Sequence, residues 1–513
     1  MGAKQTRWAK RALGKAGAWI AAALLLCLPL YMKNGYVGLV AAKQHFFWLL
    51  TACFALLAAG CAAQRRFFGR RLPRAALWLA GLVYVSLLAA LFSADPATAF
   101  WGLSGRGNGW LMLLACAVCY VCAVRCIQPG ALAALLDVFL LGAGAACLVG
   151  WVNFFGGDPL DVYYSLPAED AHQFLSTMGN INFFGALLCL AAPAALWRAA
   201  AAESRRAQIF SFFMAIFLTA GFAIANSDGP WLGLAAAVLA LLCRRSLRAP
   251  GAARVFGALA ACFIVWGAVG ALARLVPVRC PLRGVSGFVC ALPVSAAGFA
   301  VCCALAALFF CKELSPRRAG LALAGVACAL AAAGVLLANF TDLSLGPLAN
   351  LFQFDQRWGS NRGYVWGRLL YLFAHELTPL QKLIGVGPDG VNALINPHYT
   401  IYIVALNGST FDSAHNEFLQ QLLCAGALGA LCWAAFWLSR IRRGLRVNPA
   451  FALGLLAYTV QSLFSISFPG AVPLAFLFAA FAGTPMREGA GRARLLAAGG
   501  ALGFAAALAL AFF

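Results

Sequence analysis

The part of the chain best suited to chemistry is the stretch 411–437, which reads FDSAHNEFLQQLLCAGALGALCWAAFW. Its first residues are polar, and the rest is long enough for a membrane helix, because about 20 residues at 1.5 Å rise cross a hydrocarbon core of about 30 Å. The polar cluster consists of Asp412, Ser413, His415, Asn416 and Glu417. An imidazole titrates near neutrality. The sequence therefore puts a group suited to proton transfer where a bilayer meets water.

The longest polar insertion of the chain, residues 341–414, lies directly ahead of this cluster. Within it, residues 357–375 have a helical apolar spacing through Tyr364, Leu369, Leu370 and Phe373, which predicts a helix at the membrane interface. Residues 383–390, LIGVGPDG, form a glycine turn. This turn lacks the G-x4-G-K-[ST] spacing of a nucleotide loop. We expect it instead to pack closely against the bundle.

Composition indicates a membrane protein. The 513 residues are 63% hydrophobic and only 11% charged, whereas soluble domains are about a quarter charged. The net charge of +22 lies in short clusters between apolar runs, which indicates topogenic charge rather than nucleic-acid binding. We expect an all-α polytopic membrane helical bundle in which residues 1–513 form a single integral membrane domain. Residues 341–414 would be one large extracytoplasmic loop carrying part of the active site, with no separate soluble domain.

The distribution of arginine and lysine supports this topology. With the N-terminus in the cytoplasm and alternating spans, nearly all basic clusters fall on the cytoplasmic side, as the positive-inside rule requires. Only the loop 275–283, with Arg279 and Arg283, puts arginines on the outer side. The predicted spans are 16–32, 45–64, 75–93, 109–127, 130–153, 179–199, 207–225, 229–243, 254–274, 284–311, 319–340, 416–438, 449–467, 469–484 and 493–512.

The cysteines and histidines do not indicate a cofactor or a metal. Nearly all of the 19 cysteines lie in apolar runs, where cysteine behaves as a small hydrophobe. Cys116, Cys119, Cys122 and Cys126 have a spacing found in iron–sulfur proteins, but those ligands come from a loop that wraps the cluster, not from one membrane helix. The histidines lack zinc-binding spacing. We expect neither a cofactor nor a metal site.

Several motifs together resemble the O-antigen ligase family, which includes related bacterial polysaccharide polymerases. The resemblance extends over roughly residues 80–470 and includes FWGLSGRGNGWL (100–111) and MGNINFFGALLCLAAP (178–193). Its central motifs are R-x-x-x-W from Arg362 to Trp366, G-V-G from Gly385 to Gly387, the pair His415-Asn416, and L-x-x-x-G-x-x-G from Leu422 to Gly429.

The resemblance implies a glycosyltransferase-C-like bundle of roughly 12–15 transmembrane helices in the bacterial cytoplasmic (inner) membrane, with its active site on the extracytoplasmic face. It implies metal-independent transfer of a glycan from an undecaprenyl-diphosphate carrier to an acceptor hydroxyl, with inversion. His415 would be the general base and Arg362 would bind the diphosphate. Asn416, Asp412, Gly385 and Gly387 would support the site.

One position departs from the family pattern. The family usually has S-R-G at a short turn before a membrane helix, whereas this chain has Ser227-Asp228-Gly229. A carboxylate there would repel the phosphates, and we predict Arg106 as the substitute arginine. Guanidinium groups suit the task because they donate bidentate hydrogen bonds to phosphate and remain charged.

Other interpretations remain open. The acceptor could be a glycan, a lipid or a protein, so a surface polysaccharide polymerase or a protein O-oligosaccharyltransferase is an alternative, and a lipid-linked glycan transporter or flippase is one of another class. His415 could simply cap the helix of 416–438, with Asp412 or Ser413 supplying the N-cap oxygen. Arg362 could anchor a helix to lipid headgroups, and Arg106 could be an ordinary loop charge. Besides donor and acceptor, we expect contact with membrane lipid and none with nucleic acid.

Overall fold

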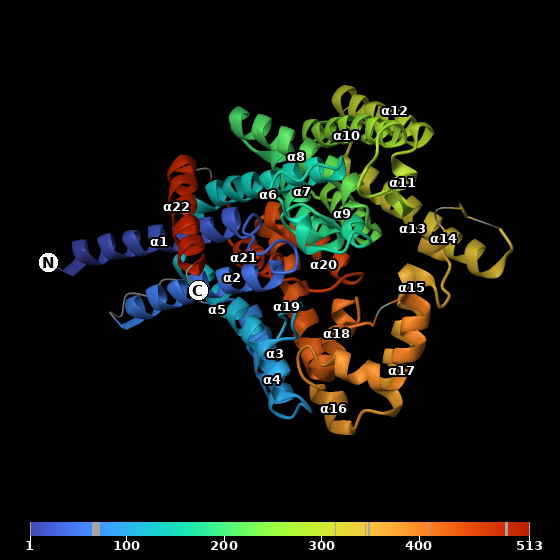
Figure 1. Cartoon of the computed structure of the whole chain (residues 1–513). Helices are drawn as coiled ribbons and strands as arrows, with labels where there is room; N and C mark the ends of the chain where they lie inside the picture. Colours follow the sequence, from blue (N-terminus) through green and yellow to red (C-terminus); the bar gives the residue numbers. More distant parts are fainter. Residues whose placement is uncertain are drawn as a thin grey trace.

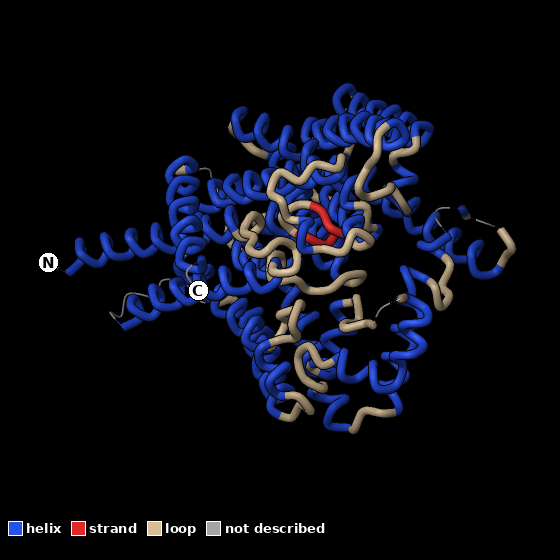
Figure 2. The backbone as a smooth tube through the Cα atoms, in the orientation of Figure 1, coloured by secondary structure: helices blue, strands red, loops and turns tan. Residues whose placement is uncertain are grey.

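The computed structural model is almost entirely helical, as predicted (Figure 1). It describes residues 2–63, 72–312, 314–343, 345–346, 349–408, 410–487 and 491–511. Within these ranges the strands are limited to one short antiparallel pair, β1 (Phe174–Leu175) and β2 (Gly179–Asn180), drawn in red in Figure 2. The prediction of an all-α polytopic membrane protein is confirmed.

Eight helices of the described residues are long and apolar enough to cross a membrane. They are α2 (Leu39–Ala63), α6 (Leu132–Phe154), α7 (Ile181–Ala201), α8 (Arg205–Ala225), α10 (Ala249–Leu275), α12 (Leu292–Cys311), α13 (Pro316–Phe340) and α22 (Arg492–Ala511). Shorter apolar helices pack among them, namely α3 (Ala75–Leu91), α5 (Trp110–Cys126), α9 (Asp228–Leu242), α21 (Val472–Ala482) and the apolar part, Gly14–Cys27, of α1 (Gly2–Cys27). Two less apolar helices, α19 (Gly426–Val447) and α20 (Pro449–Ser462), complete the bundle.

The centre of the bundle is α7, whose apolar window is entirely buried inside the protein, whereas none of the corresponding window of α13 is buried. α7 contacts α8, α9, α10 and α20. α1 runs beside α22 at the side of the bundle where both chain termini lie (Figure 1). Asp137, a charged side chain within α6, pairs with Arg198 of α7 at 2.8 Å. A buried carboxylate thus has a matching cation, as burial requires.

Residues 341–414 form short helices that gather on one side of the bundle, coloured gold to orange in Figure 1. They are α14 (Ala349–Phe352), α15 (Trp358–His375), α16 (Pro379–Ile384) and α17 (Val391–Asn407). α15, α17 and the following α18 (Glu417–Cys424) share a small apolar core of their own. The predicted helix at 357–375 is present, but its buried face is Val365, Leu369 and Leu372, and Leu370 is exposed.

The predicted span 416–438 is not one continuous helix. It breaks between α18 and α19, where Gly426 has φ +65° and a side chain on Gly426 would collide with the backbone of Leu383 at the end of α16. The helix therefore breaks where another segment approaches its backbone closely. The predicted span 284–311 is likewise divided, into α11 (Gly284–Val289) and α12. The connecting helices α4 (Pro96–Trp101), η1 (Pro129–Ala131), η2 (Tyr163–Ser165) and η3 (Ala171–Gln173) are short.

Candidate active site

His415 lies immediately before α18, in a left-handed backbone conformation with φ 49°. The next residue caps the helix, since the Asn416 side-chain oxygen accepts a hydrogen bond from the Leu419 amide at 3.1 Å. The cap is therefore Asn416, and neither Asp412 nor Ser413 supplies it. The His415 imidazole therefore does not serve as the N-cap of α18. The ring meets Phe411 edge-on, with centroids 5.2 Å apart.

The G-V-G turn holds the far end of α18. The amides of Val386 and Gly387 donate to the carbonyls of Leu423 and Cys424, both at 3.0 Å, and so satisfy carbonyls that the end of a helix leaves free. Gly385 has φ +92°, and a Cβ there would lie 2.2 Å from the Cys424 carbonyl oxygen. Gly385 and Gly387, predicted as supporting residues, thus fix the helix that begins beside His415.

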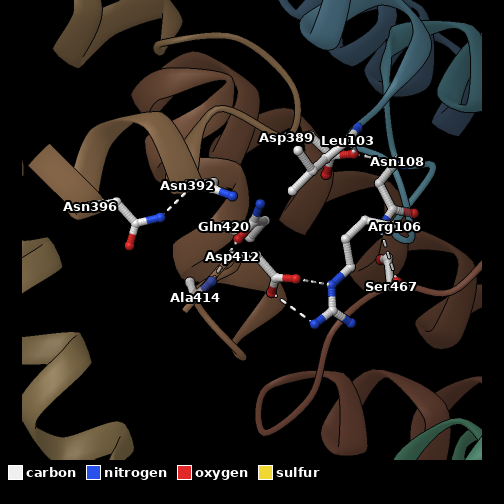
Figure 3. A network of polar contacts seen from close by, with 10 residues as sticks. All are labelled: Leu103, Arg106, Asn108, Asp389, Asn392, Asn396, Asp412, Ala414, Gln420 and Ser467. Carbon is white, nitrogen blue, oxygen red and sulfur yellow. Dashed lines mark hydrogen bonds and ion pairs between the residues drawn. The ribbon is translucent and has the colours of Figure 1, made fainter. Parts of the chain in front are cut away.

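Arg106 reaches this site from the loop between α4 and α5 (Figure 3). Its guanidinium forms a bidentate ion pair with Asp412, with Nε–Oδ2 at 2.5 Å and Nη2–Oδ1 at 2.8 Å. Such paired bonds to a carboxylate fix both the distance and the plane of the group. Two predicted site residues that lie 306 positions apart are therefore in direct contact.

The Arg106 loop is itself held by Asp389, which follows the G-V-G turn. Asp389 Oδ2 accepts hydrogen bonds from the amides of Leu103 and Asn108, both at 2.9 Å (Figure 3). The Asn108 side chain then donates to the Ser467 carbonyl at 2.9 Å. Burial raises the pKa of Asp389 to about 6, although these amide bonds oppose the rise.

The electrostatic surroundings of His415 keep its imidazole neutral. Burial, followed by the cationic groups of Arg362 and Arg106, lowers the pKa of His415 to about 3, while Asp412 opposes this effect. The structure thus brings Arg362 and Arg106 each within electrostatic reach of His415. A neutral imidazole at physiological pH can accept a proton from a substrate hydroxyl.

Arg362 borders a cavity of about 460 Å³ at the start of α15. Gly359, Ser360 and Asn361 all have positive φ, so the chain turns sharply just before Arg362. Its Nε atom is buried and has no hydrogen-bond partner. Burial lowers the pKa of Arg362, and the nearby Asp228 carboxylate opposes this. A guanidinium nevertheless stays protonated in proteins, so Arg362 brings to this cavity a positive charge that has no ion-pair partner among the described residues.

Asp228, which occupies the position of the expected arginine, has a structural partner. Its Oδ1 atom accepts a hydrogen bond from the Val285 amide at 2.9 Å. It lies at the start of α9, where Ser227 is the N-cap position but makes no capping hydrogen bond through its side chain. The Asp228 carboxylate therefore anchors the loop before α11.

Two residues of the site were not singled out by sequence reasoning. In the sequence Asp389 is only one residue of the glycine turn 383–390, and nothing in the sequence marks its two amide partners. Arg283 borders the same cavity as Arg362. A signal for it existed, because Arg283 is one of the two arginines that depart from the positive-inside rule.

Of three other histidines, one borders the same cavity as Arg362 and two lie elsewhere on the protein. His172 borders the cavity and its Nδ1 lies 2.6 Å from the Glu169 carbonyl oxygen. His375 contacts Tyr371, and His398 is exposed on α17. Within the described part of the chain, no group of three histidine, cysteine or acidic side chains is arranged to hold a metal ion.

The comparisons with known proteins bear on the same region. No curated protein sequence matches this chain. A sequence model of the O-antigen ligase family matches residues 284–434, a range that contains Arg362, the G-V-G turn and His415 and ends within α19. Arg106 and Asp228 lie outside it. The resemblance seen in the motifs is confirmed over residues 284–434, where the chain is similar to the O-antigen ligase family, and the eight long apolar helices indicate a multi-pass membrane protein.

Proposed function

We propose that the protein transfers a glycan from an undecaprenyl-diphosphate carrier to an acceptor hydroxyl, on the extracytoplasmic face of the cytoplasmic membrane. The observation that carries this proposal is the neutral, half-buried imidazole of His415 within the influence of two guanidinium groups. A base and a binding site for an anionic leaving group are the two requirements of glycosyl transfer from a diphosphate without a metal.

In this reaction His415 accepts the proton of the acceptor hydroxyl as its oxygen attacks the anomeric carbon. The bond between that carbon and the diphosphate oxygen breaks, and the lipid diphosphate leaves with the electron pair. Attack opposite the leaving group inverts the anomeric configuration. Arg362 stabilises the charge that develops on the diphosphate, since donors already oriented in a site poor in water act strongly on such charge.

Arg106 has a different part in this proposal. A phosphate would have to displace Asp412 to use the two donors of Arg106 that Asp412 occupies. Its bidentate pair with Asp412 supports a positioning role instead. Asp412 is three residues before His415, so its ion pair with Arg106 fixes the backbone segment that leads to the proposed base. Arg106 also contributes to the low pKa of that base.

The test uses the full chain purified in lipid nanodiscs, with undecaprenyl-diphosphate glycan and separate lipid, polysaccharide and peptide acceptors. We expect transfer in the presence of a chelator, and a loss of about 10²–10⁴-fold for His415→Ala. His398→Ala is the matched control, because His398 belongs to the same segment and is exposed. Undiminished transfer by His415→Ala would exclude His415 as the base. Movement of the lipid-linked glycan across the bilayer without a covalent product would instead identify a flippase.

A further inference from the structure

The loop 281–285 is attached to the turn 226–228 by three hydrogen bonds. Asn226 donates from Nδ2 to the Pro281 carbonyl at 2.8 Å and accepts from the Arg283 amide at 2.9 Å. Asp228 accepts from the Val285 amide at 2.9 Å. Gly284 has φ +52°, and a Cβ there would lie 2.4 Å from Asp228 Oδ1. The two segments therefore form one rigid unit, and that unit fixes the backbone of Arg283.

This unit and Arg362 both line the 460 Å³ cavity. Two arginines, Arg283 and Arg362, thus border the cavity from segments 79 positions apart (283 and 362). Its one carboxylate, Asp228, already accepts the Val285 amide. Apolar side chains complete the lining, including Ile181, Leu232 and Leu351.

The guanidinium of Arg283, unlike its backbone amide, has no structural role among the described residues. The other arginine that departs from the positive-inside rule, Arg279, lies 3.7 Å over the Tyr163 ring and donates to the carbonyls of Asn153 and Gly156. By contrast, the exposed guanidinium of Arg283 has no hydrogen bond or ion pair with any residue that the structure describes. Arg362 likewise retains a buried Nε without a partner. The cavity therefore has a net positive charge and unused donors.

We infer that Arg283 is the second phosphate-binding residue of the donor site and replaces the arginine missing at Asp228. Arg283 and Arg362 would each bind one phosphoryl group of a lipid-linked diphosphate, and the apolar lining would contact the start of the lipid chain. Two guanidinium groups match a diphosphate better than a monophosphate, because each can donate paired hydrogen bonds to one phosphoryl group. This inference rests on the proposed function and changes its donor-binding residues from Arg362 with Arg106 to Arg362 with Arg283.

The experiment measures equilibrium binding of undecaprenyl diphosphate and undecaprenyl monophosphate to the full chain in phosphatidylcholine nanodiscs. We expect Arg283→Gln to weaken diphosphate binding about 10-fold or more, as loss of charged hydrogen bonds does, and to weaken monophosphate binding less. Arg283→Lys should restore part of the affinity, since it keeps the charge but loses the fork geometry. Arg274→Gln is the matched control: Arg274 is exposed in the last turn of α10, nine residues before Arg283, and does not border the cavity.

Equal affinities of wild type, Arg283→Gln and Arg274→Gln for the diphosphate would overturn the inference and leave the proposed function intact. An equal loss for monophosphate and diphosphate would also overturn it, because Arg283 would then attract anionic lipid in general. Failure of the wild type itself to bind the lipid diphosphate would instead contradict the proposed function. Unchanged melting temperatures for the variants would exclude misfolding as the cause of weaker binding.

Discussion

Two arginines influence the same imidazole, yet their surroundings are opposite. Arg106 is held by Asp412 in a bidentate pair, and it borders a small cavity of about 70 Å³ together with Asp389 and Glu417. Arg362 has a buried nitrogen without a partner and borders a cavity of about 460 Å³. In the first region the guanidinium is paired with a carboxylate, and in the second it retains an unused donor. The comparison separates an arginine suited to positioning the proposed base from one that can receive an anion.

The sharpest way to break this comparison is to neutralise each arginine in turn. We expect Arg362→Gln to lower kcat/KM by about 10²–10³-fold, the cost of removing a donor that stabilises developing negative charge, and to weaken donor binding. Arg106→Gln should lower kcat while the affinity for the donor is retained. Steady-state kinetics with direct donor-binding measurements separate the two effects. Equal losses of donor affinity in both variants would show that the two regions do not differ in function.

A second test exchanges the charges of the Arg106–Asp412 ion pair. Arg106→Asp and Asp412→Arg alone each juxtapose like charges and should reduce transfer about 10-fold, whereas the double exchange should recover part of it, since contacting residues couple by about 0.5–3 kcal/mol. No matching charge exchange can be designed for Arg362, because Arg362 has no ion-pair partner within the described residues. Rates for the single and double variants give the coupling energy. Additive losses would mean that the ion pair does not position the base.

The pH dependence sharpens the electrostatic part of the comparison. Because the pKa of His415 is lowered to about 3, its imidazole stays neutral as the pH falls, and kcat/KM should remain level from pH 8 to about 5. An unperturbed histidine would give a fall centred near pH 6.5. Arg106→Gln removes a cation that lowers this pKa, so the fall should move to higher pH. A wild-type profile already centred near pH 6.5 would contradict the predicted environment of His415.

The smallest effect concerns Asp389, which holds the Arg106 loop. Asp389→Ala leaves the amides of Leu103 and Asn108 without an acceptor and should cost about 1–3 kcal/mol of stability, whereas Asp389→Asn retains an oxygen and should cost less. The raised pKa of about 6 means that the folded state favours the protonated carboxyl. Its stabilising contribution is complete below about pH 4, near the unfolded pKa, and is lost as the pH rises through 6.

Melting temperatures measured between pH 4 and pH 7 test the Asp389 prediction. Asp389→Asn should remove the pH dependence that this carboxyl contributes to stability. The melting temperature of the variant should therefore rise relative to that of the wild type as the pH increases from 4 to 7. A constant difference across this range would mean that the carboxyl does not titrate there.

The sequence predicts the membrane character and most helices, because apolar runs and arginine clusters are local properties of the chain. It does not predict the break at Gly426, whose cause is the approach of Leu383, which is distant in sequence. The motifs identify His415 and Arg362, but the partner of Arg106 could not be predicted, because the contact depends on how two loops fold together. The positions of Arg283 and Asp389 could not be predicted for the same reason.

The attachment of the Arg106 loop to Asp389 has a consequence for how the protein is made. The amides of Leu103 and Asn108 precede their acceptor by 286 and 281 positions. At about 5–20 residues per second, the ribosome reaches Asp389 roughly 15 to 60 s after it has completed this loop. The loop must therefore wait, already beside the membrane, until most of the helices have been inserted. The site is assembled late in synthesis, and a ribosome that stalls before residue 389 releases a chain whose membrane helices are largely complete but whose Arg106 loop has no anchor.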